Sequence, residues 1–486
     1  MGIDEMLERH AGEFGPWQLR HFVLTSLAWS LSAFHTMVVV FADREPDWRC
    51  TDRAGTACLP QPPRTMCGLD PGSWEWTDGP GSSTVAAWGL VCGSKYKIGL
   101  AQSGFFVGNM IGSGIFGHLA DSSFGRKRSL IAVCVASAAF GCLTSLSPSF
   151  WLYAALRFLT GLSSGGMGLC SFVLATEPVG PSARGMAGMS TYYFYSVGIA
   201  ALSGVAYLTK SSWRVLYFAT SLPSLAYALT IHACVSESPR WYLVRRRPVY
   251  AMRVMHAIAA GNGRSIPDGV SLALDSVLDV LRAPITRARL CVTVLINFIT
   301  SMVYYGLSLN VTNLNTNLHI NVVLNAAAEV PAFALTTALL DQIGRKPLTI
   351  GTMWLAGAAC LIGGSLGSMK TARMVCAVFG IFAMSGTFNL LGIYAAELFP
   401  TVVRNVALGC MSQSAQLGAI LAPLVVVFGG AVPFAVFGMC GVLGGVIGFY
   451  LPETKNRAFF ETMEGLEADE KVRLRQRLKT NFNSSS

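Results

Sequence analysis

The chain has 486 residues, of which 52% are hydrophobic and only 13% are charged, against about 25% charged residues in ordinary soluble proteins. Its apolar residues come in repeated blocks of about 20, the length that crosses about 30 Å of hydrocarbon. This pattern excludes an ordinary soluble protein and predicts a polytopic helical membrane protein. The net charge of +10 does not indicate nucleic-acid binding, because Lys and Arg lie in short loops between apolar blocks, where they act as topology signals.

The N-terminal residues 1–20 are polar and charged, and we expect them to be cytoplasmic. The first apolar run, 21–42, is too long for the hydrophobic region of a cleavable signal peptide and lacks a small-residue cleavage site. It is therefore predicted to be the first membrane span.

A hydrophilic loop, 43–96, follows the first span and contains four cysteines: Cys50, Cys58, Cys67 and Cys92. Four cysteines in one polar loop favour an oxidising compartment and two disulfides, for which three pairings remain open. Zinc is the competing interpretation, although the spacing contains no CxxC pair. A sequon at Asn310-Val311-Thr312, at the end of a later span, makes Asn310 a glycosylation candidate.

The remaining apolar blocks divide the chain into two sets of six spans. Blocks at about 98–119, 130–147, 151–175, 187–208 and 213–234 complete an N-terminal half, 21–235. A basic insert, 236–289, with apolar spacing typical of short amphipathic helices at 249–260 and 270–282, precedes the second half. That half, 290–452, contains blocks at about 290–310, 319–340, 347–367, 373–395, 405–428 and 431–451, and a basic tail, 453–486, ends the chain. The predicted fold class is an all-α membrane protein of twelve transmembrane helices.

Twelve spans place both termini on one side of the membrane. The basic turns, the 236–289 insert and the tail all fall on that side, which the positive-inside rule makes cytoplasmic. The cysteine loop is then extracytoplasmic, in agreement with the disulfide interpretation.

The two halves share charged motifs at a constant offset of 220 residues. The turn GHLADSSFGRKR, 117–128, is echoed by LLDQIGRK, 339–346, and the pairs Asp121/Asp341, Glu177/Glu397 and Arg184/Arg404 keep the same spacing. This repetition predicts a duplicated six-helix unit.

Two six-span halves joined by a large cytoplasmic connection indicate a transporter whose halves rock about a central site. Glycine permits a sharp reversal between helices, and acids pair with the basic residues of the turns, so these motifs are candidates for a cytoplasmic latch. The alternatives are that the basic turns only anchor topology and that the acids only cap helices. The candidate latch residues are Gly117, Asp121, Gly125, Arg126, Lys127, Glu177, Arg184, Glu237, Arg240, Asp341, Gly344, Arg345, Glu397, Arg404 and Glu453.

Nearly the whole chain resembles the organic cation/carnitine transporter family of the major facilitator superfamily. The resemblance is carried by the cysteine loop followed by AWGLVCGSKYKIGLAQSGFFVGNMIGSGIFGHLAD, and by ESPRWYLV, VYYGLSLNVTNL, AAAEVPAFALTTALLDQIGRKP, AELFPTVVRN and LPETK. The segments GIDEMLERHAGEFGPWQLRHF and HTMVVVFADREPDWRC are most similar to plant members. The resemblance implies the major facilitator fold, with the two halves as six-helix pseudo-repeats.

Five residues are candidates for substrate binding. Tyr304 matches an aromatic position of the seventh span that lines the cavity in this family. Glu329 is a carboxylate deep in an apolar block, where an acid attracts a cation, exchanges a proton or makes a structural pair. Tyr192 and Tyr195 offer aromatic faces to a quaternary ammonium, with packing against core or lipid as the alternative. Gln416 stands where vertebrate members place a charged residue, so the charge class of the substrate stays open.

The expected activity is secondary active or potential-driven transport of small organic cations or zwitterions, carnitine-like molecules included, by alternating access. We expect no enzyme activity and no cofactor other than a coupled proton or sodium ion. The sequence has no GxxxxGKS motif for ATP, and we expect the protein to function as a monomer. A sugar or polyol porter and a non-transporting membrane sensor are the alternatives. The plasma membrane is the first choice of location and the vacuolar membrane the second.

Overall fold

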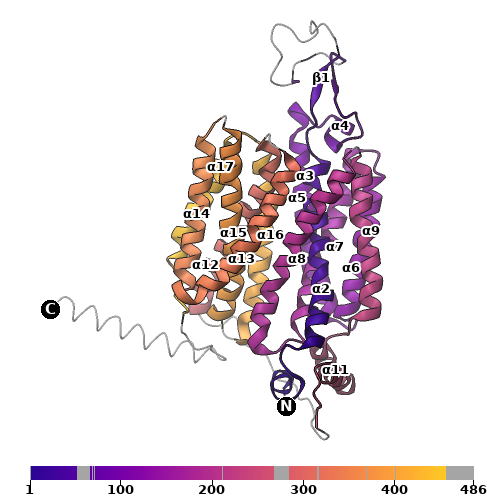
Figure 1. Ribbon diagram of the computed structural model, residues 1–486, viewed down its shortest axis with the longest axis vertical. Helices are drawn as coiled ribbons and strands as arrows, with labels where there is room; N and C mark the ends of the chain where they lie inside the picture. Colours follow the sequence, from indigo (N-terminus) through magenta and orange to yellow (C-terminus); the bar gives the residue numbers. More distant parts are fainter. Residues whose placement is uncertain are drawn as a thin grey trace, which may run out of the picture.

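The computed structural model describes residues 2–51, 66–67, 69, 72–210, 212–267, 284–314, 317–367, 369–399 and 401–455. Within these ranges, twelve helices of at least 17 residues form two lobes (Figure 1). The predicted all-α fold of twelve long helices is confirmed.

The N-terminal lobe begins with α2 (Pro16–Met37), which α3 (Val39–Ala42) continues. Its other long helices are α5 (Tyr96–Asp121), α6 (Arg126–Ser145), α7 (Phe150–Thr176), α8 (Pro181–Leu208) and α9 (Trp213–Cys234). The C-terminal lobe comprises α12 (Pro284–Leu309), α13 (Leu318–Ile343), α14 (Arg345–Ser365), α15 (Lys370–Leu398), α16 (Thr401–Val426) and α17 (Val432–Gly448). A proline stands in the first turn of α2 and of α8, where its missing N–H costs no hydrogen bond.

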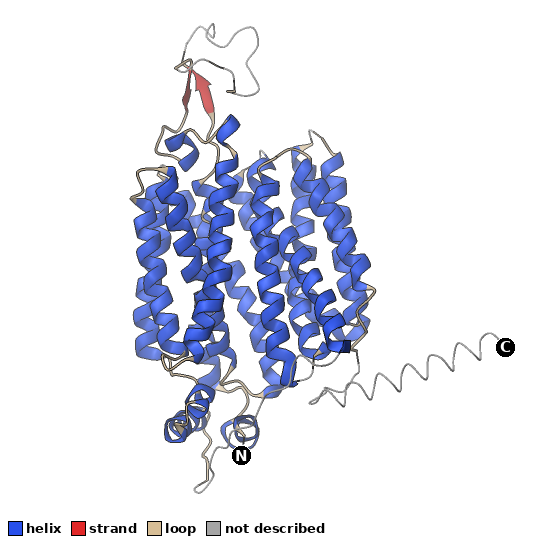
Figure 2. Cartoon of the chain, turned by 180° about the vertical axis from the view of Figure 1, so that it is seen from behind, coloured by secondary structure: helices blue, strands red, loops and turns tan. Residues whose placement is uncertain are grey.

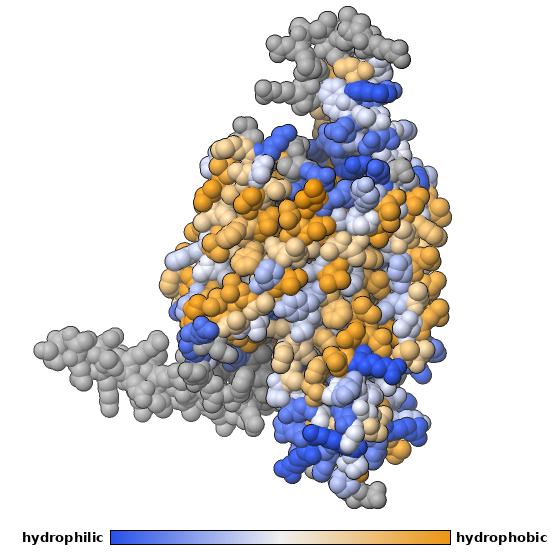
Figure 3. Space-filling model, in the orientation of Figure 1, coloured by the Kyte–Doolittle hydropathy of each residue, from blue (hydrophilic) through white to orange (hydrophobic). Residues whose placement is uncertain are grey.

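Most of these helices are long and apolar enough to cross a membrane. Nine described helical segments combine sufficient length with high hydropathy, and α17 is apolar but shorter. The surface in Figure 3 shows a broad hydrophobic band between two hydrophilic ends. A lipid-facing apolar band with polar ends is what a bilayer-spanning bundle requires.

The lobes meet along two helix pairs, α5 with α16 and α8 with α13. One buried apolar cluster contains residues of both lobes, among them Phe41, Leu202, Leu309, Val311 and Val322. Each of the other buried clusters among the described residues lies on one side of the lobe division. The lobes are therefore joined most closely near the ends of α3 and α12.

The end of the bundle near α3, here termed the loop end, carries the cysteine loop (Figure 2). Strand β1 (Trp48–Cys50) pairs antiparallel with β2 (Trp74–Trp76) in the register Trp48↔Trp76, and the short helix α4 (Thr84–Trp88) follows. Cys67 and Cys92 form a disulfide with a Cα–Cα distance of 5.7 Å, so these two sulfurs are not zinc ligands. Cys50 is also disulfide-bonded, and Cys58 lies outside the described residues.

Asn310 does not suit the proposed glycosylation. It opens a 3-10 turn, Asn310–Leu314, and its side chain is only 1% exposed. Its Oδ1 accepts a hydrogen bond from Asn313 Nδ2 at 2.9 Å. The sequon signalled a surface loop, but the turn folds back onto the C-terminal lobe and buries the amide.

The opposite end, here termed the linker end, carries α10 (Pro239–Val244) and α11 (Pro248–Gly261). The amphipathic helix expected at 249–260 is α11, whereas the helix expected at 270–282 lies outside the described residues. The polar N-terminus is also structured, as α1 (Ile3–Met6) and a π-helical turn, Leu7–Ala11. Their apolar side chains pack against Met255 and Ile258 of α11.

Asp4 fixes this N-terminal segment to the lobe. Its carboxylate pairs with Arg184 at 2.5 Å and with Arg240. Partial burial acts to raise the pKa of Asp4, but hydrogen bonds and charges from the two arginines outweigh burial and hold the pKa below its ordinary value. The N-terminus is thus an ion-paired strap across α8 and α10.

We expect Asp4→Asn to loosen this strap. Two partly exposed ion pairs contribute about 0.5–1 kcal/mol together, so hydrogen exchange of residues 3–11 should accelerate about threefold. Because the folded pKa of Asp4 is lowered, the stabilisation is present above the unfolded pKa and is lost as pH falls through the folded pKa.

Glu5→Gln is the matched control, because Glu5 pairs with Arg9 only along the same exposed turn, at 3.0 Å. It should leave the exchange of residues 3–11 nearly unchanged. Equal acceleration in both variants would contradict a specific role for Asp4.

Candidate functional site

A buried carboxylate lies on the boundary between the two lobes. Glu329, in α13, is 1% exposed, and its Oε1 accepts a hydrogen bond from the Tyr304 hydroxyl of α12 at 2.6 Å. Its Oε2 accepts a hydrogen bond from the Ser196 hydroxyl of α8. Glu329 is therefore held by one donor from its own lobe and one from the other, at the middle of the bundle.

Aromatic side chains surround this carboxylate. The Tyr304 ring lies 5.2 Å from that of Tyr305 and 5.4 Å from that of Phe388, between ring centroids. Tyr195, which precedes Ser196 in α8, is 7% exposed. An acid set among π faces is an arrangement that attracts an organic cation.

The four consecutive aromatic residues of α8 do not share one face of the helix, because consecutive residues cannot face the same way. Tyr192 and Tyr195 both contact Trp29 of α2, at 5.7 Å and 6.3 Å between ring centroids. Phe194 packs against Phe22 instead, at 6.1 Å. The structure thus places the two predicted tyrosines, Tyr192 and Tyr195, on one wall with Trp29.

Gln416 lies in α16, and no described contact joins it to Glu329. Its side-chain oxygen is buried and accepts no hydrogen bond from the described residues. On the same helix, Gln413 Nε2 donates to Ser113 Oγ of α5 at 2.9 Å, which links the two lobes. The polar face of α16 therefore lies along the lobe boundary.

Arg157 is a buried charge that does not appear among the site residues predicted from the sequence. It lies within α7 and is 0% exposed; it donates from Nη1 to the His35 carbonyl at 2.9 Å and from Nη2 to Gln102 Oε1 at 2.8 Å. Its guanidinium lies 4.3 Å from the centroid of the Phe105 ring. The sequence did contain a signal for this residue, namely an arginine inside the apolar block 151–175. A charge within a membrane span needs partners from neighbouring helices.

The first basic turn forms a compact cluster at the linker end. Arg126 Nη2 pairs with Glu177 Oε1 at 2.9 Å and with Asp121 Oδ1 at 3.2 Å. Glu237 accepts from the backbone N–H of Lys127 at 3.1 Å, while Lys127 Nζ donates to the His232 carbonyl at 2.9 Å. The cluster ties α5, α6 and α7 to the end of α9 and to the loop that precedes α10.

The second basic turn repeats this chemistry in the other lobe. Arg345 pairs with Glu397 at 2.8 Å, and Glu453 accepts from the backbone N–H groups of Arg345 and Lys346, each at 3.0 Å. Thr454 Oγ1 donates to Glu397 at 2.5 Å. The side chains of Asp341 and Arg404 lie outside the described part of the structure.

The acids of the two clusters have different environments. Burial raises the pKa of Glu177, and the Arg126 guanidinium opposes that shift. Burial likewise raises the pKa of Glu237, against hydrogen bonds from the backbone N–H groups of Ser238 and Lys127. At Glu453 burial also acts to raise the pKa, but four backbone N–H donors hold it below its ordinary value.

The described pairs of these clusters do not cross from one lobe to the other. Arg126, Glu177, Arg345 and Glu397 each pair within their own lobe, and Arg184 and Arg240 pair with Asp4 of the N-terminal strap. A latch between the two halves, closed in one state and broken in the other, therefore stays a prediction. The described pairs hold the helices of each half in fixed relation.

Comparison with known proteins agrees with this architecture. A family model described as sugar (and other) transporter matches residues 77–466. The chain is 57% identical to organic cation/carnitine transporter 4 of Arabidopsis thaliana, over 98% of this chain and 93% of that protein. It is 34% identical to organic cation/carnitine transporter 3 of the same plant, over 95% and 93%.

A solved structure shares the fold. The inward-open structure of the xylose transporter XylE from E. coli aligns with a TM-score of 0.66 and 17% identity, over 93% of this chain and 99% of that chain. The architecture is that of a multi-pass membrane transporter, not an enzyme. The chain belongs to the major facilitator superfamily and, within it, to the organic cation/carnitine transporter family.

We expect Gly125→Ala to destabilise the N-terminal lobe. Gly125 has φ 93° and ψ 164°, a region essentially reserved for glycine, and an added Cβ would lie 2.6 Å from Glu237 Oε2. The backbone strain alone costs about 1–3 kcal/mol, so thermal unfolding in detergent should begin at a lower temperature.

Gly344→Ala tests the second lobe in the same way, because Gly344 has φ 102° and a Cβ there would lie 2.8 Å from Glu453 Oε2. Gly185→Ala lies within α8, and an added Cβ there meets no atom within 4 Å. It is the control and should unfold at the same temperature as the unmodified protein or slightly above it, because alanine favours a helix over glycine. If Gly125→Ala behaves like Gly185→Ala, the turn does not depend on the glycine.

Proposed function

We propose that the protein moves small organic cations or zwitterions, carnitine-like molecules included, across the membrane by alternating access. The observation that carries the proposal is Glu329, a buried carboxylate bonded to Tyr304 of one lobe and to Ser196 of the other. A group held by both lobes is sensitive to their relative position. It also provides a negative charge where a cationic substrate would lie.

The aromatic wall supports the same substrate class. Tyr192 and Tyr195 lie with Trp29 in the N-terminal lobe, and Tyr304 and Tyr305 lie together in the C-terminal lobe. Quaternary ammonium groups bind to aromatic faces through cation–π attraction, which strengthens when water is excluded. Two relatives whose names specify organic cations and carnitine are consistent with this class.

Alternating access is supported by where the lobes touch. The buried cluster shared by the lobes includes Phe41, Leu309, Val311 and Val322 near the loop end. The clusters formed around Val179 and around Leu340, toward the linker end, each belong to one lobe. We assign this arrangement to a state closed on the extracytoplasmic side, from which rocking of rigid halves would expose Glu329 to the other side.

The energy source we propose is the membrane potential or a coupled proton or sodium ion, without ATP. Moving one unit charge down a potential of 100 mV releases about 2.3 kcal/mol, so a cationic substrate is concentrated by the potential alone. We propose the plasma membrane as the location, with the vacuolar membrane second, and a functional monomer.

A sugar or polyol porter is the nearest alternative, because the matching family description includes sugar transporters. The buried Glu329 among aromatic rings favours a cation over a neutral polyol. A non-transporting sensor is the alternative from another class, with the basic tail and the 236–289 insert as its signalling parts. Counterflow of substrate in proteoliposomes would exclude the sensor.

An uptake screen tests the proposed substrate class. Carnitine and tetraethylammonium should be taken up, and glucose should not, because only the first two carry the ammonium that Glu329 and the aromatic wall would bind. Uptake of glucose alone would favour the porter alternative.

We expect Glu329→Gln to lower cation uptake at least tenfold at unchanged surface expression, since it removes the central negative charge but keeps the volume of the side chain. Tyr304→Phe, which removes one donor and leaves the carboxylate, should have a smaller effect. A loss of expression without a change in uptake per molecule would assign Glu329 a structural role instead.

A further inference from the structure

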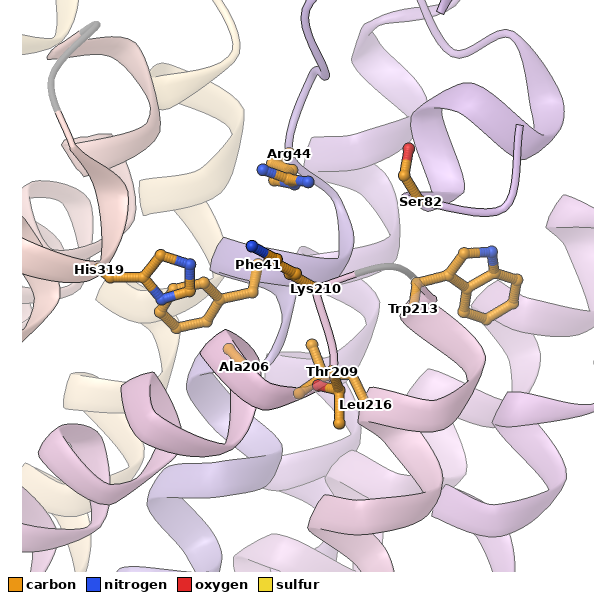
Figure 4. Close-up of a pocket in the computed structure, with 9 residues that line it drawn as sticks. All are labelled: Phe41, Arg44, Ser82, Ala206, Thr209, Lys210, Trp213, Leu216 and His319. Carbon is orange, nitrogen blue, oxygen red and sulfur yellow. The ribbon is translucent and has the colours of Figure 1, made fainter. Parts of the chain in front are cut away.

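A small basic pocket lies at the loop end, well away from Glu329. Figure 4 shows the side chains of Arg44, Lys210 and His319 gathered around Phe41, with Ala206 and Leu216 below. Three of its lining residues are basic, and none of the lining residues identified in the described chain is Asp or Glu. The pocket combines positive charge with an apolar floor.

Three of the acids near this end pair with other bases, and Asp43 is buried and accepts hydrogen bonds from Thr84 and Tyr153. Asp78 pairs with Arg44 at 3.0 Å, Glu45 with Lys95 at 3.2 Å and Glu75 with Arg49. Lys210 has no carboxylate partner in the described chain, and its ammonium lies 5.4 Å from the centroid of the Tyr207 ring. The pocket therefore keeps a positive charge that the protein does not neutralise there.

His319 is fixed at the pocket by contacts from the other lobe. Its ring stacks on Phe41 with centroids 5.0 Å apart, and its Nδ1 lies 3.3 Å from the Ser203 carbonyl oxygen. The Ser203 hydroxyl in turn donates to the His319 carbonyl at 3.1 Å. Because His319 belongs to α13 whereas Phe41 and Lys210 belong to the N-terminal lobe, the pocket lies across the lobe boundary.

The pocket is on the same helix as the central site. His319 and Glu329 are ten residues apart in α13, which is about 15 Å at the helical rise of 1.5 Å per residue. A molecule of carnitine size cannot contact both. A substrate that binds in this pocket would therefore contact the pocket and Glu329 one after the other, not at the same time.

We propose that this pocket is a docking site for the carboxylate of a zwitterionic substrate on its way to Glu329. The chemical class that this pocket favours is an ammonium carboxylate, because Lys210 attracts a carboxylate and offers no attraction to a simple quaternary cation. The inference rests on the proposed function and narrows its substrate class. The ammonium end would then be received by Glu329 and the aromatic wall.

The test compares two probes that differ in one charge: carnitine, and carnitinamide, in which an amide replaces the carboxylate. Uptake is measured against concentration in cells that display the full-length protein at their surface. Lys210→Gln should raise KM for carnitine about twofold to fivefold, the range of a single solvent-accessible charge pair, without raising KM for carnitinamide. Lys210→Arg should restore the carnitine value.

Asp78→Asn provides a change of the opposite sign. It releases Arg44 from its 3.0 Å ion pair and adds uncompensated positive charge to the pocket, so KM for carnitine should fall. Lys97→Gln is the matched control, because Lys97 also lies at this end, over the Phe150 ring, but does not line the pocket. It should leave both KM values unchanged.

The outcomes separate the pocket from the proposed function. If the unmodified protein takes up neither probe, the proposed function fails and the inference fails with it. If it takes up carnitinamide but not carnitine, the carboxylate assignment alone is overturned. The same holds if Lys210→Gln shifts both KM values alike, which is the result expected when a free inorganic anion occupies the pocket. If Lys97→Gln raises KM for carnitine as much as Lys210→Gln does, the effect comes from the overall surface charge and not from the pocket. That outcome would also overturn the assignment.

Discussion

The hydrogen-bonded carboxylate of Glu329 is the constraint on which the rest of the structure depends. An ionisable group at the centre of a bilayer-spanning bundle is costly unless donors compensate it, and its two donors, Tyr304 and Ser196, come from different lobes. The lobes must therefore stay in register at mid-depth. A movement that separates α8 from α13 leaves the carboxylate short of one donor, which a bound cation would replace by its charge.

The two basic turns make such a movement mechanically possible. The pairs Arg126–Glu177 and Arg345–Glu397 are similar in length and are 11–14% exposed, so each lobe contains the same internal brace. These braces stiffen each lobe, and the two lobes share few buried apolar contacts toward the linker end. Both features favour motion of whole lobes over bending of single helices. The motif repeated in the sequence thus stiffens the moving bodies, whereas the boundary between them depends on residues that are not repeated.

The membrane fold, the spans and the duplicated turns could be predicted from the sequence, because hydropathy and motif spacing are local properties that a single chain displays. Glu329 was visible for the same reason, as an acid inside an apolar block. Its donor Ser196, 133 residues away, was not, since the rotation of one helix against another leaves no periodic signal when hydropathy is nearly uniform around each helix. Asp4, too, appeared as an ordinary acid of a polar terminus, because its arginine partners are joined to it only by the fold.

The N-terminal strap makes the two lobes unequal. Residues 3–11 pack against α11, and Asp4 joins α8 to α10, so the first lobe has a fastening outside the membrane that supplements its brace. The described part of the second lobe has no comparable segment. We therefore expect the first lobe to stay in place during transport while the second lobe moves relative to it. The N-terminal helices would then fix the position of the transport pathway.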